Sequence, residues 1–301
     1  MLRQSIDWQT VGLLSSTLFL EETAYCESIA TWLIECTGQV GVVRLQKDDL
    51  RVDPRVDREE VVLRACRALL PGGYIVDIEA SPERSPMTSV VSRENPNERL
   101  FVCLSRSADK VTVPGQTAEN PRPYGYRRWK YDLACTEKEA PGSLAIGRLR
   151  KTRVGFELDN SFVPKCLYLQ SHWRLVELVQ GVLRLARQCL EASRENNVIP
   201  GDRLERMVTA MVPVTIVLDW RVSPQSYLER ILIMLRLHAE LLPTVSAIDE
   251  RIKELVAVVK ELEASAPKSP EDVVDWYAFL TGSENALRRL IDFYGAKRDR
   301  Y

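Results

Sequence analysis

The sequence has few of the residues that carry most enzymatic and metal chemistry. Its 301 residues include only two histidines, His172 and His238, and its seven cysteines contain no C-x-x-C pair. General acid–base catalysis and zinc binding draw mainly on histidine and on closely spaced cysteines. We therefore expect no enzyme and no metal site, and we interpret His238 as a core or interface histidine.

The phosphate-binding and nucleophile motifs are also missing. The chain contains neither G-x-G-x-x-G nor G-x-x-x-x-G-K-[ST], the glycine-rich loops that hold nucleotide phosphates. It has no nucleophile elbow, and its many carboxylates have the helical spacing of solvated surface pairs. The sequence thus predicts no catalytic residue and no cofactor.

Long hydrophobic runs are absent as well. No stretch approaches the roughly 20 apolar residues that cross a bilayer. The apolar segment 11–20 makes a poor signal peptide, because Asp7 precedes it and Glu21 and Glu22 follow it. The scattered cysteines are typical of reduced thiols. We expect a cytoplasmic protein, whose net charge of −1 provides no general attraction for nucleic acid or membranes.

The residues that are present indicate a two-part α+β protein. Hydrophobic residues make up 45% and charged residues 28% of the chain, as in folded globular proteins. Between residues 39 and 159, short alternating apolar runs are separated by turns such as Pro71-Gly72-Gly73 and Pro114-Gly115. This pattern predicts an N-terminal β-sandwich or barrel, and it does not suit alternating βαβ units.

Beyond Pro164 the period changes to that of helices. The sequence predicts a domain at 1–163, a helical bundle at 164–263 and a short helical segment at 264–301. Ser223 and Pro224 form a helix start, and the helix that follows is apolar nearly all round. Such a helix lies at the centre of a bundle or is covered by another subunit.

Two segments suggest binding. The segment 122–131 interleaves basic and aromatic residues, which fits either a packed β-strand or a platform for single-stranded nucleic acid. The N-terminal segment 7–19 has many large apolar residues, which either fold back onto their own domain or insert into a partner.

Several motifs, in order, resemble the TssK family of type VI secretion baseplate subunits. Trp8, Leu14 and Phe19 match the family's N-terminal pattern, although Ser16 and Leu18 replace its proline and histidine. The other matches are the turn Leu70-Pro71-Gly72-Gly73, the junction 155–164 (GFELDNSFVP) with Leu167 and Ser171, and Ser223-Pro224-Gln225-Ser226-Tyr227, where the family has His-Pro-x-x-Tyr. The similarity runs over about residues 1–245.

This resemblance implies a β-sandwich shoulder and a helical neck through which three copies associate. It also implies docking on the baseplate wedge proteins TssF and TssG, at the cytoplasmic face of the inner membrane. We expect the wedge contact at Trp8, Leu13, Leu14 and Phe19 and the trimer contact at Leu228, Ile231 and Leu235. The family's C-terminal head, which contacts the membrane complex, is expected to be missing or replaced.

Overall fold

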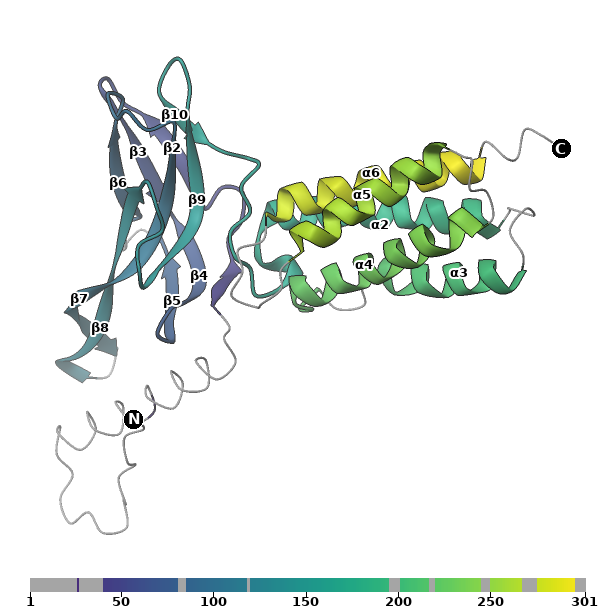
Figure 1. The fold of residues 1–301 in the computed structure, drawn as a ribbon. Helices are drawn as coiled ribbons and strands as arrows, with labels where there is room; N and C mark the ends of the chain where they lie inside the picture. The colour runs from purple at the N-terminus through teal and green to yellow at the C-terminus, as the bar shows by residue number, and fades with distance from the viewer. Residues whose placement is uncertain are drawn as a thin grey trace, which may run out of the picture. The chain divides into compact units, whose positions relative to one another are not determined.

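The structure is a computed structural model that describes residues 26, 40–80, 85–117, 120–194, 201–216, 220–244, 250–266 and 275–295, with the backbone alone at 108–129. The chain divides into two compact units (Figure 1). Among the described residues, 40–42 and 48–158 belong to a β-rich unit, and 159–295 together with Val43–Lys47 belong to a helical unit. The predicted α+β fold class is confirmed. Among the described residues, no helix is long and apolar enough to cross a membrane.

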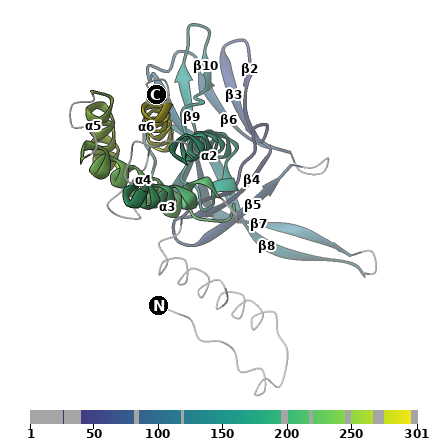
Figure 2. The same cartoon turned by 90° about the vertical axis from the view of Figure 1, so that its right-hand side faces the viewer.

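The β-rich unit has the following strands: β1 (Gly41–Arg44), β2 (Leu50–Pro54), β3 (Arg58–Leu63), β4 (Ala65–Leu70), β5 (Tyr74–Glu79), β6 (Met87–Ser92), β7 (Arg99–Thr117), β8 (Asn120–Thr136), β9 (Ser143–Lys151) and β10 (Phe156–Leu158). They form three sheets, ordered β1-β4-β5, β10-β9-β7-β8 and β2-β3-β6. Strand β2 contacts β10, and β6 contacts β8, so the last two sheets face each other as a sandwich. Figure 2 shows the β7–β8 hairpin extending beyond the other strands.

The apolar residues 61–69 form parts of two strands. Strand β3 ends at Leu63 and pairs with β6, whereas β4 begins at Ala65 and pairs with β5. The exposed Arg64 lies between them; its N–H donates to Asp49 O and its carbonyl accepts from Ala80 N. The chain therefore changes sheets at Arg64 without leaving its backbone groups unpaired.

The helical unit is built from α2 (Trp173–Arg194), α3 (Gly201–Thr215), α4 (Pro224–Leu241), α5 (Glu250–Ser265) and α6 (Trp276–Gly295), with the short 3-10 helices η1 (Leu169–Ser171) and η2 (Leu242–Thr244). Helix α2 packs against α3 and α6, α3 against α4, and α5 against α4 and α6 (Figure 2). The Ser223 side chain accepts from Ser226 N at 3.2 Å, with Pro224 in the first turn, so the predicted start of α4 is confirmed.

One segment from early in the sequence belongs to the helical unit. Leu45 N donates to Ser171 O at 2.7 Å, and Trp173 N donates to Leu45 O at 3.4 Å. The Leu45 side chain is only 2% exposed, and the Lys47 ammonium lies 5.6 Å from the Trp173 ring. These contacts place Val43–Lys47 at the start of α2.

Candidate interaction surfaces

The described residues offer little for catalysis. His172 and His238 are buried, and burial lowers the pKa of each imidazole to about 4, so that both are neutral at pH 7. His238 Nδ1 lies 2.7 Å from Met234 O, while its Nε2 has no hydrogen-bond partner within the described part of the chain. No group of His, Cys, Asp or Glu side chains there could hold a metal ion. His238 is thus a core histidine, as the sequence suggested.

The cysteines in the two cores are poor nucleophiles. Burial raises the pKa of both the Cys66 and the Cys189 thiols to about 12. Because the thiolate is the reactive form, these side chains behave as small apolar core residues. The described cysteines are all free thiols.

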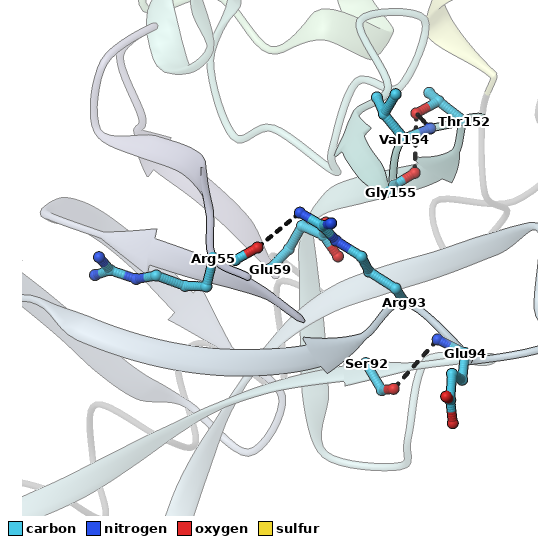
Figure 3. A network of polar contacts seen from close by, with 8 residues as sticks. All are labelled: Arg55, Glu59, Ser92, Arg93, Glu94, Thr152, Val154 and Gly155. Atoms are coloured by element: carbon cyan, nitrogen blue, oxygen red, sulfur yellow. Dashed lines mark hydrogen bonds and ion pairs between the residues drawn. The ribbon is translucent and has the colours of Figure 1, made fainter. Parts of the chain in front are cut away.

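A partly buried ion pair, Glu59–Arg93, joins three turns of the sandwich (Figure 3). The Glu59 side chain on β3 is 3% exposed, and Arg93 Nε donates to its Oε1 at 2.7 Å. Arg93 Nη2 also donates to the Arg55 carbonyl at 2.7 Å. The backbone at Gly155, just before β10, packs directly on this carboxylate and leaves no room for a Cβ.

We call these three turns, residues 55–58, 92–95 and 152–155, the turn cluster. Two valines of the turn cluster are exposed: Val56 to 87% and Val154 to 82%. The ion pair holds the turns together, so these side chains sit on an ordered surface. Apolar side chains on rigid loops are suited to contacting another protein.

The three residues expected to form the trimer contact lie in the interior of their own bundle. Leu228, Ile231 and Leu235 on α4 are at most 2% exposed within one chain. They face the neighbouring helices because their spacing of three and four residues places them on one side of α4. Within a single chain these side chains are covered by their own bundle, and their role in a trimer stays a prediction.

Another stripe on α4 is exposed. Ile233 is 61% exposed, and Leu237 and Leu241, one and two turns further along, are half-buried. Val212 of α3 and Ile216, directly after that helix, are also exposed. The helix thus carries apolar side chains beyond the side that packs on α3 and α5, and the described residues leave Ile233 exposed.

The remaining predicted sites lie wholly or partly outside the described residues. Trp8, Leu13, Leu14 and Phe19, the expected wedge contact, are all outside them. The segment 122–131 belongs to β8, paired with β7, and side chains are described only for Lys130, which is exposed, and Tyr131. The Tyr131 hydroxyl donates to Ile75 O at 2.8 Å, which is a structural contact.

Sequence reasoning missed the Glu59–Arg93 pair, although a signal was present. In β3, Glu59 alternates with Val61 and Leu63 and so shares their buried face. An acidic residue at an inward strand position requires a partner. That partner is Arg93, more than thirty residues later.

The described part of the chain consists of a β-sandwich and a helical bundle, and solved structures with a similar fold are known. A crystal structure of TssK matches over 96% of this chain and 69% of that chain, at 13% identity and a TM-score of 0.62. A chain from the TssK–TssF–TssG baseplate subcomplex of a type VI secretion system matches over 97% of this chain and 100% of that chain. Its identity is 15% and its TM-score is 0.63.

TssK of the EAEC type VI secretion system, solved with a nanobody, matches over 92% of this chain and 69% of that chain, at 16% identity and a TM-score of 0.56. No protein-family model and no curated protein matched the sequence. The chain has a TssK-like fold, so the resemblance seen in its motifs is confirmed at the level of the fold.

Proposed function

We propose that this chain is a structural component of a type VI secretion baseplate and not an enzyme. The observation that carries this proposal is the TssK-like fold, which extends over both the β-rich and the helical parts of the sequence. One matched chain comes from a complex named for TssK, TssF and TssG. The two neutral, buried histidines agree with a role in assembly.

The partners proposed for the chain are wedge proteins of the TssF and TssG kind. The apolar N-terminal residues Trp8, Leu13, Leu14 and Phe19 would form the contact, because large apolar side chains often carry most of the binding energy of an interface. The test is co-purification of the wedge proteins with a tagged chain that carries Trp8→Ala and Phe19→Ala. We expect the double variant to remain folded and to lose the wedge proteins, while a chain with Val90→Ala, a change at an exposed valine of β6, keeps them. Full retention by the double variant would reject this contact.

The chain is further proposed to form a homotrimer through the exposed stripe of α4. Leu228, Ile231 and Leu235 then support the trimer indirectly, by fixing α4 against its own bundle. Ile233 offers the largest exposed apolar side chain on α4, with Leu237 beside it. Burying such a side chain stabilises association by about 1.5–3 kcal/mol per copy.

Light scattering on the purified chain tests the trimer. We expect a trimer at micromolar concentration, and a smaller species for Ile233→Asp with unchanged circular dichroism. Val90→Asp places the same charge on an exposed position of the β-rich unit and should leave the mass unchanged. A monomeric wild-type chain would refute the trimer, and a trimeric Ile233→Asp variant would refute its location.

The proposed baseplate role places the chain in the cytoplasm, at the inner membrane. The alternative, binding of single-stranded nucleic acid by segment 122–131, stays a prediction that no described contact favours. Retention on immobilised oligonucleotide that falls steeply with salt would support it, because phosphate contacts release counterions.

A further inference from the structure

An open groove runs along the outside of α2 in the helical unit. It has a volume of about 410 Å³ and is lined by Gln180, Leu183, Arg184, Arg187, Gln188 and Glu191 of α2, with Trp220 from the residues before α4. The exposed α2 residues of this set follow one another at helical spacing on the side turned away from the core. The groove lies entirely within one unit of the chain.

Contacts below the surface fix the walls of the groove. Arg187 Nε donates to Thr215 O at 3.2 Å, which holds its guanidinium at the carboxyl end of α3. The Trp220 carbonyl accepts from Gln170 N at 3.2 Å, which anchors the tryptophan backbone to η1. Leu183, 8% exposed, belongs to the core and provides an apolar floor. A preformed groove loses little freedom when a ligand binds.

The charged side chains of the groove indicate which kind of ligand it can bind. Arg184 and Arg187 are exposed and one helical turn apart, and Glu191 is the one acidic side chain of the lining. The groove is thus net positive in a chain whose overall charge is −1. Two neighbouring guanidinium groups favour carboxylates, and the half-buried Trp220 offers a flat apolar surface.

We propose that this groove binds a peptide segment of a partner protein that carries acidic side chains next to a large apolar one. The carboxylates pair with Arg184 and Arg187, and the apolar side chain packs on Trp220 above Leu183. Gln180 is the first α2 residue of the lining and Gln188 lies one turn beyond Arg184, and the amides of both can bond the peptide backbone. Its lining includes none of the residues proposed above for the wedge and trimer contacts.

Fluorescence anisotropy on the full chain tests the proposal. The probe is a fluorescein-labelled octapeptide in which pairs of glutamates alternate with a leucine and phenylalanine pair. We expect saturable binding that Arg184→Glu weakens at least about tenfold, because one charge-assisted hydrogen bond is lost and a repulsion replaces it. Trp220→Ala should weaken binding by a similar factor.

Matched controls make the result decisive. Arg206→Glu applies the same charge change to an exposed arginine of α3 outside the lining and should leave the affinity within twofold. A peptide with lysine in place of glutamate, or with serine in place of its apolar residues, should not bind.

Three results would overturn the proposal. The first is that the acidic peptide does not bind up to millimolar concentration. The second is that Arg206→Glu weakens binding as much as Arg184→Glu does. The third is that a single-stranded oligonucleotide binds more tightly and displaces the peptide. Circular dichroism of each variant identifies any that fails to fold. Should Trp220→Ala unfold, Trp220→Phe keeps the packing and should bind with intermediate affinity.

Discussion

The Glu59–Arg93 pair, with its buried carboxylate, allows a quantitative test of how the sandwich holds its turns. Replacing Arg93 with methionine keeps most of the side-chain volume but leaves the Glu59 carboxylate, 3% exposed, without its positive partner. Breaking a fully buried pair costs about 3–5 kcal/mol. Arg93 is 37% exposed, so water reaches its site and we expect a smaller loss, about 2–3 kcal/mol of the free energy of unfolding.

Removing the carboxylate instead should be milder. In Glu59→Met the arginine can turn toward water, so we expect a cost of about 1 kcal/mol, and a similar cost for the double variant. The double-mutant cycle should therefore give a coupling energy of about 2–3 kcal/mol.

Urea unfolding at neutral pH, followed by circular dichroism, measures these values. The control is Arg67→Met, which breaks the surface pair with Asp77, whose side chain is 58% exposed, and should leave the midpoint nearly unchanged. An Arg93→Met protein as stable as the wild type, or a double variant no more stable than Arg93→Met, would refute the role given to the buried pair.

Three further changes test packing and burial. Gly147→Ala places a Cβ 2.6 Å from Leu50 Cδ2 in the sandwich core, so overpacking should lower the midpoint of urea unfolding by the equivalent of about 1–3 kcal/mol; an unchanged midpoint would contradict this close approach. Leu45→Ala empties a buried site beside α2 and should cost about 2–4 kcal/mol in the melting of the helical signal; loss confined to the β-rich unit would disagree with the grouping of Val43–Lys47. Burial lowers the pKa of His238 from 6.5 to about 4, so the unfolded chain binds a proton that the folded chain does not, and stability falls as the pH drops from about 6.5 toward about 4. Between about pH 7 and about pH 5 the free energy of unfolding falls by about 2 kcal/mol for this reason, and His238→Met should remove that part of the pH dependence. A variant whose stability depends on pH as strongly as that of the wild type would contradict this.

Local signals in the sequence predicted the elements well. The β-rich front and helical back follow from the side-chain period, which depends on neighbours two, three or four residues away. The start of α4 at Ser223 and Pro224 followed from capping chemistry that is complete within a few residues.

Long-range contacts were not predictable in this way. The return of Leu45 to the start of α2 and the pairing of Glu59 with Arg93 join residues distant in sequence, and no local pattern specifies such partners. The apolar character of α4 gave no indication of which side its own bundle covers. That choice depends on how α3 and α5 pack, so Leu228, Ile231 and Leu235 lie inside while Ile233 lies outside.

The most direct test of the proposed role is co-purification with the wedge proteins. The tagged full chain would be expressed together with the TssF and TssG proteins encoded in the same genome, then purified by affinity and by size. We expect both wedge proteins to remain with the chain in one complex of defined mass. Recovery of a folded chain free of both, under conditions in which the two wedge proteins bind each other, would contradict the baseplate role.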